Sequence, residues 1–186
     1  MTSPARPLLL HCCCGPCSTA CVERLLAEGR ACRLYFSNSN LDSEGEFNLR
    51  LENLRKVAVH YGLGEVQIDA YDHRGWLSQV SQVPGYAQCR EGGARCAKCF
   101  AWSLSRAAQA AAAQGMNFAT SLTVSPHKNS RMLLSIGAEH SHFEPYDFKK
   151  SDGFLRSLRL SRQLGLYRQS YCGCEFSRTA SIERRT

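Results

Sequence analysis

Most of the eleven cysteines in this 186-residue chain gather in three short segments. The first two segments are His11-Cys12-Cys13-Cys14-Gly15-Pro16-Cys17 and Arg95-Cys96-Ala97-Lys98-Cys99. Each segment can present two sulfurs to one centre without backbone strain, and soft thiolates at this spacing suit zinc or an iron–sulfur cluster. Spacing alone does not choose between these metals, so both stay open.

The third segment, Tyr171-Cys172-Gly173-Cys174, separates two thiols by a single glycine. Gly173 permits the tight turn that a strained, easily reduced disulfide would need. An odd number of cysteines cannot be wholly paired within one chain, and so many thiols in a reducing compartment favour metal or redox chemistry. We interpret Cys32, in an apolar strand pattern, and Cys21 as small buried hydrophobic residues instead.

Alternating strands and helices must position these thiols. Apolar runs predict strands at 8–10, 32–36, 65–68 and 117–120, and helical spacing predicts helices at 18–28, 44–61, 99–114, 130–136 and 154–164. This order predicts one α/β domain over 1–186, with a core at 7–177 and a C-terminal tail at 178–186. We expect a Rossmann-like, doubly wound, mostly parallel sheet with the metal site at the carboxyl ends of its strands. Cys96 and Cys99 then lie at a helix N-terminus, whose partial positive charge favours thiolates.

Composition and motifs exclude several classes of protein. Hydrophobic residues at 44% and charged residues at 21% are far from the composition of disordered chains. The longest apolar runs fall short of the roughly 20 residues that cross a bilayer, and the N-terminus lacks a signal-peptide core, so we expect a cytoplasmic protein. No glycine-rich dinucleotide motif or Walker sequence is present. We therefore expect electrons to arrive from another protein, such as a reduced ferredoxin or flavodoxin.

Two other cysteine motifs do not fit. The radical-SAM signature spaces its thiols by three residues and then two, whereas Cys14, Cys17 and Cys21 are spaced by two and then three. A zinc ribbon needs two pairs brought together over a short insert, but most of the predicted fold separates the pairs here. An isolated structural zinc stays open.

Six segments, in order between residues 8 and 177, resemble the epoxyqueuosine reductase family QueH. They are Leu10-His11-Cys12-Cys13-Cys14-Gly15-Pro16-Cys17, Ser37-Asn38-Ser39-Asn40, Arg95-Cys96-Ala97-Lys98-Cys99-Phe100, Thr120-Ser121-Leu122-Thr123-Val124-Ser125-Pro126-His127-Lys128, Asp147-Phe148-Lys149-Lys150 and Leu166-Tyr167-Arg168-Gln169-Ser170-Tyr171-Cys172-Gly173-Cys174. Any one of them could arise by chance, but six in order make coincidence implausible.

The resemblance implies an activity and its cofactor. The activity is the two-electron removal of the epoxide oxygen from epoxyqueuosine at the tRNA wobble position, the last step of queuosine biosynthesis, without cobalamin. The implied ligands of a [4Fe-4S] cluster are Cys13, Cys14, Cys96 and Cys99. The resemblance also implies that Cys172 and Cys174 are a redox-active pair that forms a disulfide.

Three positions depart from the family pattern. Ser39 stands where we expect proline, Cys12 where we expect an aliphatic residue, and Lys149 where arginine is more usual. Cys12 leaves open which two of three consecutive thiols bind iron. Adjacent residues of a strand point to opposite faces, so a turn must aim two of them inward.

The chemistry itself demands a second redox element. Removing an epoxide oxygen as water takes two electrons and two protons, whereas a [4Fe-4S] centre normally passes one electron at a time. Cys172 and Cys174 could store the other electron pair, or could hold an additional mononuclear iron that acts as a Lewis acid. Asp147 is a candidate proton donor or metal ligand, with a helix cap or a lysine partner equally open.

Basic residues between 149 and 168 suit the anticodon loop of a tRNA, and the net charge of +7 agrees with a polyanionic partner. The candidates for nucleic-acid binding are Lys149, Lys150, Arg156, Arg159, Arg168 and Tyr167. Arg156 and Arg159 share a helical face, and Tyr167 or Tyr171 could stack on an unpaired base. A solvated helix face is the alternative. His127 and Lys128 could likewise meet a phosphate.

Two other functions compete with the reductase. The first is a zinc-stabilised tRNA-binding module without redox chemistry. The second, an ATP-dependent tRNA-thiolating enzyme, is disfavoured because the phosphate loop is missing.

Overall fold

The computed structural model describes residues 6–183, and a parallel sheet forms its centre. The strands are β1 (Leu8–His11), β2 (Cys32–Phe36), β3 (Gln67–Ile68) and β4 (Asn117–Thr120). Their order is β3-β2-β1-β4, and β1 pairs in parallel with both β2 and β4. The chain thus builds outward from β1 on one side and returns to its other side for β4. This reversal beside β1 is the topological switch of a doubly wound sheet.

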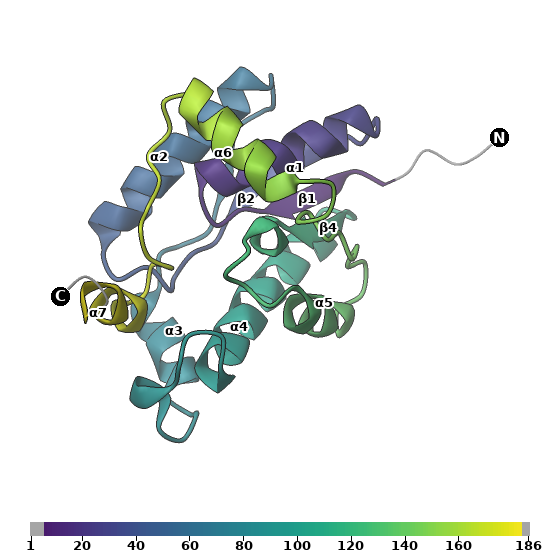
Figure 1. Cartoon of the computed structure of the whole chain (residues 1–186). Helices are drawn as coiled ribbons and strands as arrows, with labels where there is room; N and C mark the ends of the chain where they lie inside the picture. The colour runs from purple at the N-terminus through teal and green to yellow at the C-terminus, as the bar shows by residue number, and fades with distance from the viewer. Residues whose placement is uncertain (1–5, 184–186) are drawn as a thin grey trace.

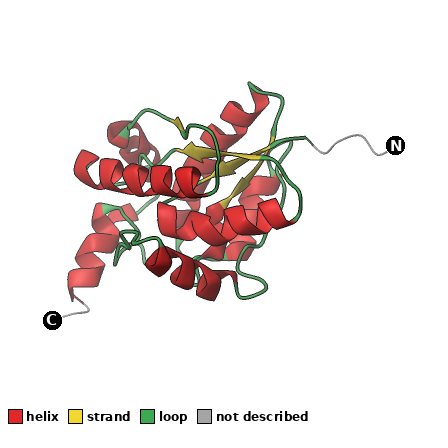
Figure 2. Ribbon diagram, turned by 90° about the horizontal axis from the view of Figure 1, so that it is seen from above, coloured by secondary structure: helices red, strands yellow, loops and turns green. Residues whose placement is uncertain are grey.

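Helices cover both faces of the sheet (Figures 1 and 2). One layer contains α1 (Gly15–Ala27), packed against α2 (Glu44–His60) and α6 (Gly153–Gln163). The other layer contains α4 (Ala94–Ala112), packed against α3 (His73–Val80) and α5 (Ser130–Ala138). The remaining elements are the 3-10 helices η1 (Tyr86–Gln88) and η2 (Ser121–Val124), and α7 (Glu175–Glu183). The predicted doubly wound α/β class is confirmed.

Alternation along β1 divides the core between the two layers. Leu8, Leu10 and Cys12 pack with side chains of α1 and α2, whereas Leu9 and Cys13 pack with side chains of α4. Successive side chains of a strand point to opposite faces, so every second residue enters the same layer. The strand therefore carries one cysteine into each layer as it ends.

His11 fixes the carboxyl end of β1 to its neighbours. Its Nδ1 lies 3.0 Å from Thr120 Oγ1 at the end of β4, and its Nε2 lies 3.1 Å from the Ser37 carbonyl oxygen after β2. Burial lowers the pKa of His11 to about 4, so the imidazole is neutral at physiological pH. Three strand ends are thereby held together beneath the cysteine loop.

Predicted and observed elements differ at several boundaries. The strand expected at 65–68 is short, and the helix expected at 99–114 starts five residues earlier, at Ala94. Neither α3 nor α7 was predicted from the sequence. α3 begins at an Asp72 cap, whose carboxylate accepts a hydrogen bond from Gly75 N at 2.9 Å. The expected C-terminal tail is helical as far as Glu183, and residues 184–186 lie outside the described part of the chain.

Among the described residues, no helix combines the length and the apolar character that crossing a bilayer requires.

Candidate metal and redox site

Three sulfurs gather where β1 leads into α1. The Sγ atoms of Cys13, Cys14 and Cys17 all lie within 4.8 Å of one another, and those of Cys13 and Cys14 are 3.8 Å apart. Cys14 is the N-cap of α1 and Cys17 lies in its first turn, so the positive end of the helix faces the sulfurs. Gly15 lets this helix start so close to α2, because a Cβ there would lie 2.6 Å from the Asn53 carbonyl oxygen.

Protons are shared unevenly within this three-sulfur group. The thiols of Cys13 and Cys17 donate to Cys14 Sγ and lower the pKa of Cys14 well below its ordinary value. The contact with Cys14 raises the pKa of Cys13 to about 12, and the contact with Cys13 raises the pKa of Cys17 as well. Three thiolates this close repel one another, so all three ionise together only around a cation. The group is compatible with metal binding.

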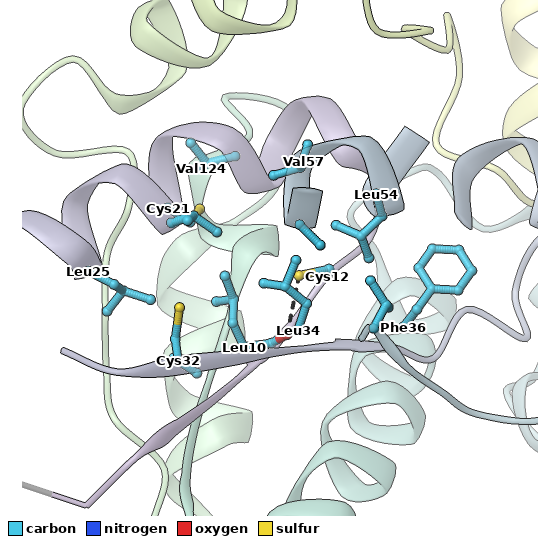
Figure 3. Packing of buried hydrophobic residues seen from close by; sticks show 14 of the residues in the cluster. Leu10, Cys12, Cys21, Leu25, Cys32, Leu34, Phe36, Leu54, Val57 and Val124 are labelled. Carbon is cyan, nitrogen blue, oxygen red and sulfur yellow. Dashed lines mark hydrogen bonds between the residues drawn. The ribbon is translucent and has the colours of Figure 1, made fainter. Parts of the chain in front are cut away.

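Cys12 points away from this group. It is fully buried, and its Sγ donates to the Leu10 carbonyl oxygen at 3.2 Å (Figure 3). Strand alternation separates Cys12 from Cys13, and the turn at Cys14, the N-cap of α1, brings Cys14 beside Cys13. These two of the three consecutive thiols therefore face the site. Cys21 and Cys32 lie in the same apolar cluster as Cys12, so the interpretation of both as buried hydrophobic residues is confirmed.

Cys96 and Cys99 lie in the first turns of α4, as the sequence predicts. Cys96 packs against the cluster that contains Cys13 and Cys14, and its Sγ accepts a hydrogen bond from Gly92 N at 3.2 Å. Cys99 packs against the cluster that contains Cys174. Within residues 6–183, the compact group of mutually close metal-type ligand atoms consists of Cys13, Cys14 and Cys17 and does not include Cys96 or Cys99.

A cavity of ≈ 500 Å³ opens over the sulfurs. Two of its lining residues, Cys13 and Cys17, belong to the three-sulfur group, and a third thiol, Cys172, faces it from the C-terminal segment. Its other lining residues are charged, polar or aromatic: Glu91, Ser125, His127, Lys128, Phe154, Arg168, Gln169, Ser170 and Tyr171. Five consecutive residues, 168–172, thus form one wall.

Lys128 contacts the thiol of this wall. Its Nζ donates to Cys172 Sγ at 3.0 Å, and both side chains are half-buried. Burial by itself would lower the pKa of Lys128, but the neighbouring Cys172 raises it above its ordinary value. The lysine is therefore an ammonium at neutral pH, and its Nζ faces the Cys172 sulfur.

Arg50 of α2 holds the segment 171–174 in place. Arg50 is 2% exposed, and its Nη1 donates to the Cys172 carbonyl oxygen at 3.0 Å, while its Nε donates to Glu46 at 2.7 Å. Gly173 has a φ of +135°, and a Cβ there would lie 2.4 Å from a Leu41 side-chain carbon. Only glycine fits this turn. Cys172 and Cys174 are free thiols, so the expected disulfide is not formed in this structure.

Asp147 lies outside the lining of the cysteine cavity. It lines a separate cavity with Arg24 and Lys150, and its Oδ1 accepts a hydrogen bond from Lys149 N at 3.2 Å. It is not among the described residues that line the cysteine cavity. The carboxylate supports a local turn instead.

The predicted basic residues have different neighbours in the structure. Arg168 lines the cysteine cavity, whereas Nε and Nη2 of Arg156 each donate to a carboxylate oxygen of Glu23 at 2.7 Å. Lys149 donates to the Lys128 carbonyl oxygen at 3.0 Å, and Tyr167 donates to Glu46. The side chains of Lys150 and Arg159 are exposed.

Sequence reasoning named two residues of the site without finding their roles: Cys17 had no assigned role, and Lys128 was expected only to meet a phosphate. Cys17 completes the three-sulfur group, and its signal was present in the Cys14-Gly15-Pro16-Cys17 spacing. The contact of Lys128 with Cys172 spans 44 residues of sequence, so no local pattern announced it.

A family model described as epoxyqueuosine reductase QueH matches residues 8–180. The chain belongs to the QueH family. A QueH from Thermotoga maritima is 34% identical over 184 residues, which cover 96% of this chain and 92% of that protein. A QueH from Streptococcus pyogenes serotype M1 is 33% identical over 91% of this chain and 69% of that protein. Both relatives are named epoxyqueuosine reductases, which are oxidoreductases, and the predicted resemblance is confirmed.

Proposed function

We propose that this chain is an epoxyqueuosine reductase that removes the epoxide oxygen of epoxyqueuosine in tRNA as water, in the cytoplasm and without cobalamin. One observation carries the proposal. A single cavity of ≈ 500 Å³ is lined both by thiols of a metal-type group, Cys13 and Cys17, and by a separate thiol–ammonium pair, Cys172 and Lys128. Reduction of an epoxide needs both an electron source and a proton source, and the cavity adjoins both.

The donor set fits a [4Fe-4S] cluster held by Cys13, Cys14, Cys96 and Cys99. All four donors are soft thiols, and they lie at the N-termini of α1 and α4, where the helix ends carry partial positive charge. A cluster spreads its ligand sulfurs further apart than a single ion does, so ligands outside the compact group are compatible with it. When bound, the cluster supplies electrons one at a time.

Residues of the chain itself store the electron pair that the reaction needs. Cys172 and Cys174 together store two electrons as a dithiol, which matches the electron count of the reaction. A reduced ferredoxin or flavodoxin is the proposed source of these electrons. An additional mononuclear iron held by Cys172 and Cys174 is the alternative role of this pair, in which the iron would act as a Lewis acid.

The cavity also suits the end of an anticodon loop. Phe154 and Tyr171 offer aromatic faces to a nucleobase that leaves its stack, and Arg168 and His127 offer positive or polar groups to its phosphate. Lys150 and Arg159 are exposed and free to meet the backbone further along the loop. Arg156 would first have to leave Glu23. Asp147 contributes through the Lys149 turn rather than at the cavity.

Anaerobic reconstitution tests the proposal. Cluster-loaded protein with a strong reductant should convert epoxyqueuosine in tRNA to queuosine, as read by mass spectrometry of the digested nucleosides. Cys96→Ala should abolish the conversion, whereas Cys32→Ala, which alters a core cysteine, should retain it. Absence of conversion by protein with four irons and four sulfides per chain would contradict the proposal.

The compact three-sulfur group also favours a second candidate, the zinc-stabilised tRNA-binding module. A tetrahedral zinc with bonds of about 2.3 Å to sulfur holds its ligand sulfurs roughly 3.8 Å apart. The Cys13–Cys14 distance of 3.8 Å meets that value. One equivalent of zinc after anaerobic purification, no broad visible absorption and no conversion would together favour the module.

A further inference from the structure

The two thiols of the C-terminal pair differ in what they can reach. Cys172 lines the cavity and accepts a hydrogen bond from Lys128 Nζ at 3.0 Å. Cys174 is 8% exposed and packs with Trp76 and Val80, and it is not among the described residues that line the cavity. A substrate in the cavity therefore meets Cys172 and Lys128 directly, and Cys174 only through Cys172.

The arrangement around Lys128 is fixed from several sides. Its carbonyl oxygen accepts a hydrogen bond from Lys149 Nζ, and its own Nζ lies 5.8 Å from the centre of the Phe100 ring. The partner thiol is fixed as well, because Arg50 holds the Cys172 carbonyl. A nucleophile and a proton donor are thus held side by side at the wall of one cavity, which is the arrangement that covalent catalysis requires.

We propose that Cys172 is the nucleophile that opens the epoxide, that Lys128 is the acid that protonates the departing oxygen, and that Cys174 is the resolving thiol. The inference rests on the proposed function, because it describes how that cavity handles its substrate. It assigns different tasks to two cysteines that the reductase proposal treats only as an electron store.

The reaction balances in two steps. The Cys172 thiolate attacks one epoxide carbon, so that a carbon–sulfur bond forms as a carbon–oxygen bond breaks, and the oxygen takes a proton from the Lys128 ammonium. Lys128 then takes the proton of the Cys174 thiol, and the resulting thiolate attacks Cys172 Sγ. A sulfur–sulfur bond forms, and the electron pair of the carbon–sulfur bond becomes the second bond of the alkene. Hydroxide leaves the neighbouring carbon and becomes water with that same proton.

Two thiol groups are oxidised to one disulfide while the substrate gains two electrons. The first turnover therefore needs no added reductant. Later turnovers need the disulfide to be reduced, either by a one-electron donor protein acting twice or by a dithiol.

Trapping the first step tests the roles of the two cysteines. Reduced Cys174→Ser protein in excess over tRNA that carries epoxyqueuosine should form a covalent protein–tRNA adduct that survives a denaturing gel. Adding Cys172→Ser to this variant should remove the adduct. Wild-type protein without added reductant should form queuosine while losing two thiols per product. Conversion by the wild type, with no adduct in Cys174→Ser and no loss of thiols, would overturn the inference and leave the reductase proposal standing.

Alkylation tests the Lys128–Cys172 pair without any substrate. We expect iodoacetamide to label Cys172 at least 10-fold more slowly in Lys128→Met than in the wild type, as read by peptide mass spectrometry. Lys56→Met is the matched control, because Lys56 is exposed on α2 and pairs only with Glu52 among the described residues, at 3.7 Å. Cys172 in the Lys56→Met variant should be labelled at the wild-type rate. Equal rates of Cys172 labelling in Lys128→Met and Lys56→Met would overturn the proposal that Lys128 activates Cys172, whether or not the protein proves to be a reductase.

Discussion

Replacing Arg50 should cost a large part of the stability of this fold. The guanidinium is 2% exposed and its partner, Glu46, is 10% exposed, with 2.7 Å between Arg50 Nε and Glu46 Oε1. Arg50→Met keeps most of the apolar stem but leaves the Glu46 carboxylate without its cation. Breaking a buried ion pair from one side costs about 3–5 kcal/mol, because the remaining charge stays desolvated. Loss of the bond to the Cys172 carbonyl, at 3.0 Å, adds about 1 kcal/mol.

Urea denaturation of the reduced protein, followed by circular dichroism, measures this loss in the free energy of unfolding. Adding Glu46→Gln to Arg50→Met removes the orphaned charge and should recover at least about 1 kcal/mol. Arg55→Met, on the exposed side of the same helix, is the matched control and should change stability by less than about 0.5 kcal/mol. A loss below about 1 kcal/mol in Arg50→Met, or no recovery in the double variant, would refute the reasoning.

Three further predictions concern the helix start, acid stability and tRNA. Gly15→Ala places a Cβ 2.6 Å from a backbone oxygen of α2 and should cost about 1–3 kcal/mol in urea denaturation, whereas Gly45→Ala, whose nearest neighbour lies at 3.9 Å, should not destabilise the protein. Burial would raise the pKa of Asp69, but hydrogen bonds from Arg106 and Ser37 lower it, so its stabilising contribution exists above about pH 4 and is lost as the pH falls further. The stability advantage of the wild type over Arg106→Met should therefore shrink between pH 6 and pH 3, and a constant advantage would contradict this assignment. Arg168→Gln should weaken tRNA binding and flatten the plot of log affinity against log salt by about 0.7, and an unchanged slope would move the phosphate contact elsewhere.

Local patterns predicted the sheet well because its strands are apolar and short. Residues 32–36 and 117–120 form strands with the predicted bounds, and β1 extends the predicted run by one residue. α3 escaped prediction because Gly75 interrupts its helical pattern, and a side-chain cap at Asp72 compensates. The burial of Trp76 and Val80 adds tertiary packing to this local cap, and together they form a helix whose intrinsic propensity is weak.

The site was predictable where spacing constrains geometry and not where distant segments meet. Cys13 and Cys14 follow β1 at the carboxyl end of the sheet, where ligands are expected. The sequence indicated that only two of the three consecutive thiols can face the site, but it did not show that Cys12 is the one that turns away. The ion pair of Arg156 with Glu23 joins residues 133 positions apart, so a charge run alone could not show that this arginine is occupied. Asp147 is the opposite case, because its contact is local: its carboxylate accepts a hydrogen bond from Lys149 N, two residues away, and this bond accounts for its position.

The positions of the cavity residues along the chain bear on how a metal would reach the three-sulfur group. A polypeptide synthesised as far as Gln163 already contains the four described strands and the thiols of Cys13, Cys14, Cys17, Cys96 and Cys99. The wall at 168–172 and its anchor on Arg50 come last. Cys13 and Cys17 therefore precede in sequence the wall that lines the same cavity, so a metal carrier would have wider access to the three-sulfur group before residues 168–172 pack.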